Sequence, residues 1–556
     1  MTRAVSVPAA PLLLDAVATH ARERPDAVAI RFLERGEDVT SEATYADLVT
    51  QAEAVASVLL DRGCAGRPVI LALRPGIGFV ATLLGCLRAG VIAVPVPFPP
   101  AGEGRQRLVT VLNELRGAAA VTDDAAAIGA LSDESRLILS LTAMPRRNTT
   151  DLPAMPAADA PAVIQYSSGS TRAPRGIVLS HGNIASNLAM VREVFGTDTG
   201  TVGVNWLPPH HDMGLFGAIL QPLYAGGLGV LMPPFAFIQK PVRWLRAIDR
   251  HRGDIGGGPN FGYELCVRRV RPQDAPGLDL SSWTIAFCGA EPIRAASLQG
   301  FADHFAPARF DPRAILPCYG LAEATLLATS ARPGTGLRQV PVASRPTHGP
   351  RPRVSCGEPP MGCHVSIHDP ETGVALPLGA AGEICVAGPH VAVGEWCAET
   401  GRITALSAAL PDNGRRLLRT GDIGALTAAG LVVIDRMKDI LFLHGRNLHA
   451  ADIEQAAIAA TGQALMAVAA FAAGEPDQEI LVLLGEIATA DRQGRDLARL
   501  SRDIAAAVGQ ECGVVPRTGF LPHGALPRTT SGKIRRQAAR RAYAAGTLHL
   551  LATVEA

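Results

Sequence analysis

YSSGSTRAPRG, at residues 166–176, is a run of small hydroxyl residues and glycines that lies between two short apolar segments. The flanking segments, residues 162–165 and 177–179, are rich in aliphatic and β-branched side chains, which predicts a loop that joins two strands. Ser180 and Asn183 follow at positions typical of a helix cap. The stretch therefore predicts a strand, loop, strand and helix in succession.

The loop itself has the chemistry of a phosphate-binding segment. Hydroxyl and backbone N–H donors come from Ser167, Ser168, Gly169, Ser170 and Thr171, and glycine lets the main chain approach an anion closely. The pattern G-x-x-x-x-G-K-[ST], which opens directly into a helix, is not matched. A flexible surface turn is the alternative interpretation, so the rest of the chain must decide.

Composition limits the classes of partner. With 556 residues, the chain is long enough for two or more domains. The 52 Lys and Arg residues balance 51 Asp and Glu residues, so the net charge of +1 favours neither nucleic acid nor an acidic membrane as a partner. Small molecules and specific protein surfaces are the expected partners.

The cysteines and the apolar segments predict a cytoplasmic protein. The ten cysteines form no C-x-x-C pair, which favours reduced thiols. The N-terminal segment lacks the features of a signal peptide. Charged residues, glycines and prolines interrupt the apolar stretch at residues 69–96, which leaves no membrane span of the required ~20 residues.

The first half of the chain predicts an α/β fold. Helices are expected at residues 12–20 and 47–60, the second capped near Thr44. Residues 68–73, 81–89 and 91–96 then predict a strand, a helix and a strand, the pattern of a parallel sheet with helical crossovers.

Polar residues recur where predicted strands end, the edge at which open α/β sheets bind ligands. One such group is His210-His211-Asp212, which leads into an apolar helix; a simple helix cap is the alternative. Residues 256–261 predict a glycine-rich turn before another helix. Strands at residues 284–288 and 315–318 run into the turns GAEP and YGLAE, where Tyr319 could be merely half-buried and Glu323 a first-turn acid.

The second half of the chain changes character. Residues 331–353 carry five arginines and five prolines but no acid, which predicts a loop or small insertion. Short β-prone pieces at residues 354–393 predict a small β-rich subdomain. After DRMKD, at residues 435–439, a small α+β pattern begins. Lys533 follows a Ser-Gly turn, where a lysine is usually solvated.

Six motifs in order resemble the adenylate-forming superfamily of acyl-CoA synthetases, peptide adenylation domains and luciferases. They are YSSGSTRAPRG, GAEP, YGLAEAT, RTGD, DRMKD and LPRTTSGK. The stretches WLPPHHDMGLFGAILQPLYAGG and GGGPNFGYELCVRR resemble one branch, the fatty acyl-AMP ligases. The resemblance implies a large N-terminal AMP-binding domain at residues 1–435 and a small mobile α+β domain at residues 436–556.

The resemblance also implies an activity. ATP and Mg²⁺ would activate a fatty acid to an acyl-adenylate with release of pyrophosphate. The acyl group would then pass to the phosphopantetheine arm of a separate holo acyl carrier protein, in polyketide, lipopeptide or lipid biosynthesis. Catalysis of this kind needs alignment and charge neutralisation rather than a protein nucleophile.

By the same resemblance, each motif contributes residues with a stated role. Residues 167–171 would cradle the phosphates, Lys533 would reach the α-phosphate and carboxylate, Glu323 would hold Mg²⁺, and His211 would guard the acyl pocket. Adenine and ribose would be surrounded by Gly289, Ala290, Glu291, Tyr319, Gly320, Asp422 and Arg436. The acyl tunnel would draw on Met213, Gly214, Gly258 and Phe261 within residues 213–220 and 259–266. Lys438 would be the hinge.

Two departures from the family pattern keep alternatives open. Arg172 and Arg175 stand where many relatives have glycine and lysine, and arginine retains the positive charge. The insertion that distinguishes fatty acyl-AMP ligases should lie at residues 331–353, and it is short. A fatty acyl-CoA ligase is therefore the nearest alternative, and an inactive lipid-binding homologue is another.

Overall fold

The computed structural model comprises two compact units. Of the described residues, the first unit holds those up to 166 together with 175–420 and 425–433, and the second holds 421–424 and 434–554. The assignment of residues 1–435 to AMP binding and of residues 436–556 to a mobile domain stays a prediction. The residues described are 10–98, 103–132, 136–143, 152–166, 175–271, 273, 276–343, 350–406, 409–412, 415–443, 446–462, 464–474, 479–487, 496–528 and 534–554.

One eight-stranded sheet of the first unit carries the strand ends that the sequence singled out. Its central strands are parallel, whereas β2 and β14 are antiparallel to their neighbours. The strand order is β14 (Leu327–Ser330), β13 (Ile315–Gly320), β12 (Ile285–Cys288), β11 (Ile255–Gly258), β9 (Val202–Asn205), β10 (Leu228–Leu231), β1 (Val28–Phe32) and β2 (Ser41–Thr44).

A second eight-stranded sheet contains the strands around residues 166–176. The order is β20 (Arg402–Thr404), β19 (Gly394–Cys397), β8 (Gly176–Ser180), β7 (Pro161–Tyr166), β4 (Ile92–Pro95), β3 (Pro68–Ala72), β5 (Ala119–Thr122) and β6 (Ile138–Ser140). Strands β7 and β8 pair antiparallel, which confirms that the loop joins two strands. The predicted cap is also confirmed, because Ser180 and Asn183 form a capping box on α6 (His181–Phe195).

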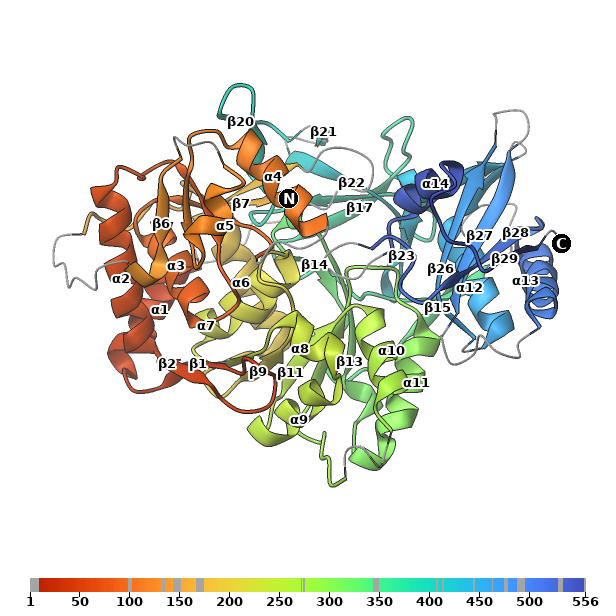
Figure 1. The fold of residues 1–556 in the computed structure, drawn as a ribbon, viewed down its shortest axis with the longest axis horizontal. Coiled ribbons are helices and arrows are strands. Elements are labelled where there is room, and N and C mark those ends of the chain that lie inside the picture. The colour runs from red at the N-terminus through yellow and green to blue at the C-terminus, as the bar shows by residue number, and fades with distance from the viewer. Residues whose placement is uncertain are drawn as a thin grey trace, which may run out of the picture. The chain divides into compact units, whose positions relative to one another are not determined.

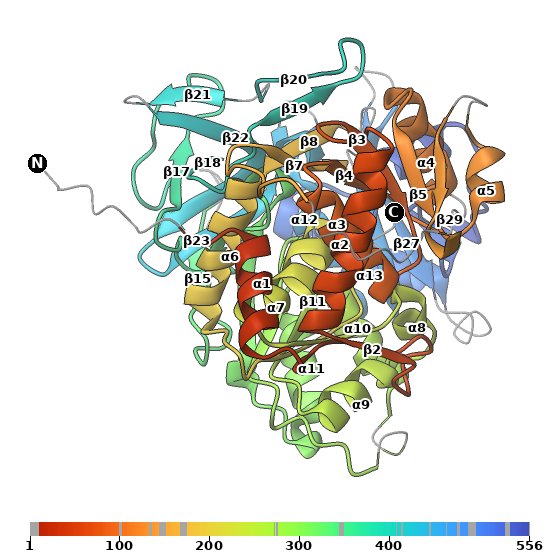
Figure 2. The ribbon, with the colours of Figure 1, turned by 90° about the vertical axis from the view of Figure 1, so that its left-hand side faces the viewer.

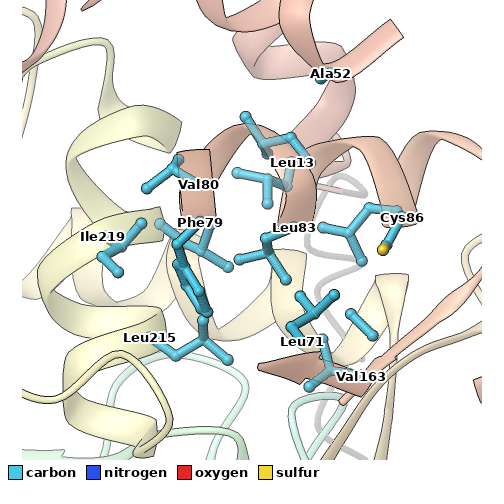
Figure 3. Close-up of a cluster of buried hydrophobic side chains, with 14 of the residues drawn as sticks. Leu13, Ala52, Leu71, Phe79, Val80, Leu83, Cys86, Val163, Leu215 and Ile219 are labelled. Carbon is cyan, nitrogen blue, oxygen red and sulfur yellow. The ribbon is translucent and has the colours of Figure 1, made fainter. Parts of the chain in front are cut away.

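A layer of helices packs between these two sheets. It contains α1 (Leu13–Glu23), α2 (Tyr45–Asp61), α3 (Ile77–Arg88), α6, the π-helix η2 (Met213–Leu220) and α7 (Gln221–Ala225). The predicted cap at Thr44 is present on α2. Figure 2 shows α1, α2 and α3 side by side. In Figure 3, Phe79 of α3 points toward Leu215 and Ile219 of η2, and Leu71 and Val163 come from strands of the second sheet.

Further helices cover the outer face of each sheet, so the first unit is a layered α/β fold as predicted. A core of aromatic residues joins the first sheet to α8 (Pro234–Gln239), α9 (Val242–His251), α10 (Asn260–Arg269) and α11 (Ala295–Phe305). Helices α10 and α11 lie side by side (Figure 1). Helices α4 (Glu103–Glu114) and α5 (Ala125–Gly129) cover the second sheet.

The predicted β-rich subdomain is present, and a strand pair lies beside it in the sequence. Strands β17 (His364–His368), β18 (Ala381–Ala387), β22 (Arg415–Thr427) and β21 (Ala409–Asp412) form a sheet in that order, with β23 (Gly430–Arg436) paired to β22. Residues 331–353 were expected to be a loop or small insertion. They contribute β15 (Gln339–Val342), which pairs antiparallel with β16 (Arg351–Val354), a strand pair that the sequence did not predict.

Two turns predicted near strand ends begin later than expected. Gly256 to Gly258 belong to β11 and pair in parallel with β12. Neighbouring atoms leave no room for a side chain there, since a Cβ on Gly257 would lie 2.1 Å from the Phe287 oxygen. Tyr319 and Gly320 are the last residues of β13 rather than a turn. Both segments place their glycines where backbones pack most closely.

The second unit is a small α+β fold, as the pattern after residue 435 predicts. Strands β26 (Leu465–Ala473), β27 (Ile480–Ile487), β28 (Arg517–Pro522) and β29 (Ala552–Val554) form one sheet, and β24 (Ile440–Leu443) pairs with β25 (Arg446–His449). Helices α12 (Ala450–Thr461), α13 (Leu497–Cys512) and α14 (Arg536–Ala544) share its apolar core. Among the described residues of the whole chain, no helix is long and apolar enough to span a membrane.

Candidate active site

A mostly apolar pocket lies on the face of the first sheet that α6 and η2 cover. About 780 Å³ of space there is free of atoms, a volume that includes open solvent. Its apolar walls include Phe195 of α6, Met213 of η2, Phe287 of β12 and Leu326. The predicted tunnel segment at residues 213–220 therefore contributes to this pocket. A mostly apolar cavity of this kind suits an alkyl or aryl chain.

One end of the pocket, the end at β13 and here called its mouth, is formed by residues that the sequence assigned to nucleotide binding. Ala290, Tyr319 and Gly320 all line it. Ala290 has a φ of 69°, which is uncommon for a residue with a side chain and occurs often at functional sites. Gly289 is needed because a Cβ there would lie 2.8 Å from the Cys318 oxygen. The structure thus brings GAEP and the end of β13 together.

Glu291 makes a structural contact that its sequence motif did not predict. The backbone N–H of Phe261, in the first turn of α10, donates a hydrogen bond of 3.3 Å to the Glu291 carboxylate. The buried Asn260 side chain also donates to the Pro292 oxygen at 2.9 Å. These contacts attach the GAEP turn to the start of α10, where a carboxylate is favoured by the helix dipole.

Glu323 lies in the short helix η6 (Ala322–Ala324) and contacts a cation. One guanidinium nitrogen of Arg175 lies 3.2 Å from the Glu323 carboxylate, and the other lies 3.2 Å from Glu395. Thr325, which ends this helix, has a φ of 64° and donates a hydrogen bond of 2.7 Å to the His390 oxygen. A β-branched residue in this conformation is strained, so Thr325 is a second strained position of the first unit.

Both histidines of the pair after β9 are partly buried. Burial lowers the pKa of His210 to about 3, with a smaller contribution from the nearby Arg107. Its ring centroid lies 4.6 Å from that of His211. Asp212 accepts a hydrogen bond of 2.8 Å from the Met213 backbone and lines the pocket with Met213. Both interpretations of Asp212, as a cap and as a site residue, are therefore compatible with its position.

Three predicted substrate residues have mainly packing contacts. A Cβ on Gly258 would lie 2.9 Å from the Trp206 ring, and the Phe261 ring packs edge-on against the same tryptophan at 5.6 Å. A Cβ on Gly214 would lie only 1.9 Å from the Pro208 oxygen. None of these three is among the described residues that line the pocket. Their contact with substrate stays a prediction.

In the second unit, the predicted ribose and hinge residues are close in the chain. Arg436 donates to Asp422, with the guanidinium nitrogen 3.0 Å from the carboxylate oxygen. Asp422 is buried, whereas Arg436 is exposed. Lys438 is exposed in the short helix η7 (Met437–Asp439).

Residues 167–174 and 529–533 lie outside the described residues, so the predicted phosphate loop and Lys533 have no structural account. The base of the second segment is described. Arg528 and Ile534 form an antiparallel bridge, and Arg528 pairs at 2.8 Å with Glu486, which is fully buried. Arg536, two residues past the bridge, forms ion pairs of 2.7 Å with Asp439 and Glu454.

One described side chain, the Glu323 carboxylate, has the chemistry of a magnesium ligand. Magnesium prefers oxygen ligands and is commonly held by one or two carboxylates together with substrate phosphates. Glu323 offers such a carboxylate, and its side chain is only 16% exposed. The Arg175 contact would have to loosen for a metal to share that oxygen.

Four polar residues of the pocket were missed by the sequence analysis. Thr197, Thr201, Asn205 and Gln221 line it opposite the mouth. They come from the loop after α6, from β9 and from the start of α7. The sequence motifs near these segments indicated other roles. Only the spacing of Thr201, Gly203 and Asn205, which alternate on one strand face, could have indicated a shared surface.

Comparisons with known proteins agree with this geometry. The model of the AMP-binding enzyme family matches residues 17–396. The chain belongs to the AMP-binding enzymes. This AMP-binding enzyme is 32% identical to the medium-chain-fatty-acid–[acyl-carrier-protein] ligase of Moorena producens, over 94% of this chain and 93% of the relative. It is also 32% identical to the 4-hydroxyphenylalkanoate adenylyltransferase of Mycobacterium marinum, over 96% and 91%.

A solved structure extends the comparison to the fold. The fatty acyl-adenylate ligase of L. pneumophila, in complex with acyl adenylate and pyrophosphate, has 32% identity and a TM-score of 0.72, with 98% of each chain covered. The predicted resemblance to the fatty acyl-AMP ligases of the adenylate-forming superfamily is thereby confirmed. The AMP-binding enzyme is a member of an ATP-using family.

Proposed function

We propose that this protein activates a fatty acid or a related carboxylic acid with ATP and then transfers the acyl group to a separate holo carrier protein. The pathway would be polyketide, lipopeptide or related lipid biosynthesis. The observation that carries this proposal is the apolar pocket whose mouth is formed by Ala290, Tyr319 and Gly320. An acid in this pocket would place its carboxylate at the mouth, beside the residues proposed for adenine.

In the first step, a carboxylate oxygen attacks the α-phosphorus of ATP, and the bond from that phosphorus to the bridging oxygen breaks. Pyrophosphate leaves with the negative charge. Residues 167–171 would hold the phosphates and Lys533 would neutralise charge at the α-phosphate and carboxylate, so the chain contributes alignment and electrostatic stabilisation. A bound magnesium ion would screen the phosphate charges, and Glu323 would hold it.

In the second step, the phosphopantetheine thiolate attacks the acyl carbon, and AMP leaves. Asp422 would bind the ribose hydroxyls and would have to share its contact with Arg436. Rotation about Lys438 between the steps would be absorbed by a few backbone dihedral angles. The ten free cysteines support a cytoplasmic location for this chemistry.

The test combines pyrophosphate exchange with a choice of acceptor. The protein is incubated with ATP, Mg²⁺ and a series of acids, and then with holo carrier protein or coenzyme A. We expect acid-dependent exchange and acyl transfer to the carrier. Glu323→Gln should remove most of the exchange, whereas the control Glu358→Gln should retain it, because Glu358 pairs only with Arg332 at the surface among the contacts of the described residues.

A fatty acyl-CoA ligase is the second candidate. The specific observation in its favour is the short segment at residues 331–353, of which β15 and the start of β16 are described. Efficient acyl-CoA formation would replace the carrier-protein assignment. Exchange at background level with every acid would instead favour an inactive lipid-binding homologue.

A further inference from the structure

The wall of the pocket opposite its mouth is polar, although the rest is mostly apolar. Thr197, Thr201, Asn205 and Gln221, here called the far wall, are all more than nine-tenths buried, at 4%, 6%, 2% and 4% exposure. Strand β9, which carries Asn205, is three strands from β13 at the mouth. Neighbouring strands are about 4.8 Å apart, so the far wall lies roughly 14 Å from the mouth.

Two amide oxygens of the far wall lack a hydrogen-bond donor among the described residues. They are Asn205 Oδ1 and Gln221 Oε1, both fully enclosed. The Gln221 nitrogen donates to the Thr197 hydroxyl at 3.0 Å, and the Thr201 hydroxyl accepts from the Asp198 backbone at 2.9 Å. If the nitrogen and oxygen of the Gln221 amide were exchanged, the oxygen would face the Thr197 hydroxyl and the nitrogen would lack a hydrogen-bond partner instead.

A buried polar atom without a partner costs free energy, so such atoms usually indicate a group that completes them. Here the missing group must donate to the amide oxygens, or accept from the amide nitrogens if nitrogen and oxygen are exchanged. It should be neutral, because Thr197, Thr201, Asn205 and Gln221 carry no charge that could pair with an ammonium group. A hydroxyl group meets both conditions.

Gly203 of β9 lines the pocket between two of the polar residues, and a Cβ there would lie 3.3 Å from Pro222 Cγ and 3.6 Å from the Asn205 amide nitrogen. A side chain at this position would crowd Pro222 and the Asn205 amide, so the far wall needs glycine here.

From these contacts we propose that the far wall binds a hydroxyl group on the distal part of the acid, so that hydroxylated acids are preferred over plain fatty acids. This inference rests on the proposed function, because it concerns the acid activated in the same pocket. A site built to bond a hydroxyl discriminates strongly against analogues that lack it, whereas an apolar pocket discriminates only weakly.

The test measures pyrophosphate exchange with pairs of acids that differ by one hydroxyl. Octanoate, decanoate and dodecanoate are each compared with the ω-hydroxy acid of the same length, and a phenylalkanoate is compared with its ring-hydroxylated form. For the wild-type protein we expect at least one pair in which the hydroxylated acid has a kcat/KM about 10-fold higher or more, mainly through KM. In the double variant Asn205→Leu/Gln221→Met, the plain acid of that pair should become the better substrate.

Two results would overturn the inference while leaving the proposed function intact. One is a wild-type protein that uses the plain acid of every pair as well as, or better than, the hydroxylated acid. The other is a folded double variant with an unchanged ratio, and Thr197→Val serves as a second variant if the double variant does not fold. Exchange with none of the acids would overturn the proposed function itself, and this inference with it.

Discussion

Gly217→Ala should shorten the acyl chain that the protein accepts. Gly217 lies in the π-helix η2 and lines the pocket, where an added Cβ would be 3.2 Å from Leu326 Cδ2. Leu326 also lines the pocket and ends in a flexible side chain, so it can move by the few tenths of an ångström required. The new methyl group then takes space that substrate would otherwise fill.

The size of the effect follows from apolar burial. One methyl group displaces about one substrate methylene, and burial of a methylene is worth about 0.8 kcal/mol, or about 4-fold in kcat/KM. We therefore expect the preferred chain to become about one methylene shorter, with the longest good substrate losing about 4-fold relative to the next shorter acid. Replacing glycine by alanine in a helix stabilises the helix by up to about 1 kcal/mol, so the melting temperature of the variant should stay the same or rise.

The assay is pyrophosphate exchange over a series of straight-chain acids, with kcat/KM for each. Gly214→Ala is the matched contrast in the same region, because its Cβ would meet the Pro208 backbone oxygen at 1.9 Å, and it should lower the melting temperature sharply. An unchanged chain-length profile for a stably folded Gly217→Ala protein would refute the assignment of this pocket to the acyl chain.

Three further predictions concern stability and catalysis. Asn187→Leu should destabilise the protein by about 3 kcal/mol in urea denaturation, because the Asn187 side chain makes two buried hydrogen bonds, of 2.8 and 3.0 Å, with the backbone of β14; a loss below about 0.5 kcal/mol would contradict this. Burial lowers the pKa values of His181 and His390 to about 4 and of His210 to about 3, below the ordinary 6.5, so their contribution to stability is complete above pH 6.5 and is lost as the pH falls toward 4. The melting temperature should therefore decline as the pH is lowered from 6.5 toward 4. A melting temperature that does not change over this range would contradict the prediction. Lys533→Ala should abolish pyrophosphate release while ATP binding stays within a few fold, as titration with a fluorescent nucleotide would show; lost binding in a folded protein would exclude the proposed role.

Local rules predicted much of the fold. The caps at Thr44 and at Ser180 with Asn183 follow from side chains that bond backbone groups three residues away, so the sequence alone contains them. The strands around residues 166–176 follow from apolar runs of the right length.

Contacts between distant residues could not be predicted in the same way. The pairing of β15 with β16 depends on a partner strand, and Gly257 reads as a turn until the close approach of Phe287 is known. The far wall was missed for the same reason, because Asn205 and Gln221 meet only when β9 and α7 pack.

The π-helix η2 has a consequence for how pockets of this kind diverge. A π-turn holds more residues than the 3.6 of an α-helical turn, so deletion of one residue could restore regular helix. Because the wide turn absorbs the deleted residue, the helix beyond it would keep its orientation, and only the side chains of the π-turn itself would be repositioned. The pocket-lining residues of η2, Met213 and Gly217 among them, could thus be rearranged by a single deletion, without turning the helix that follows.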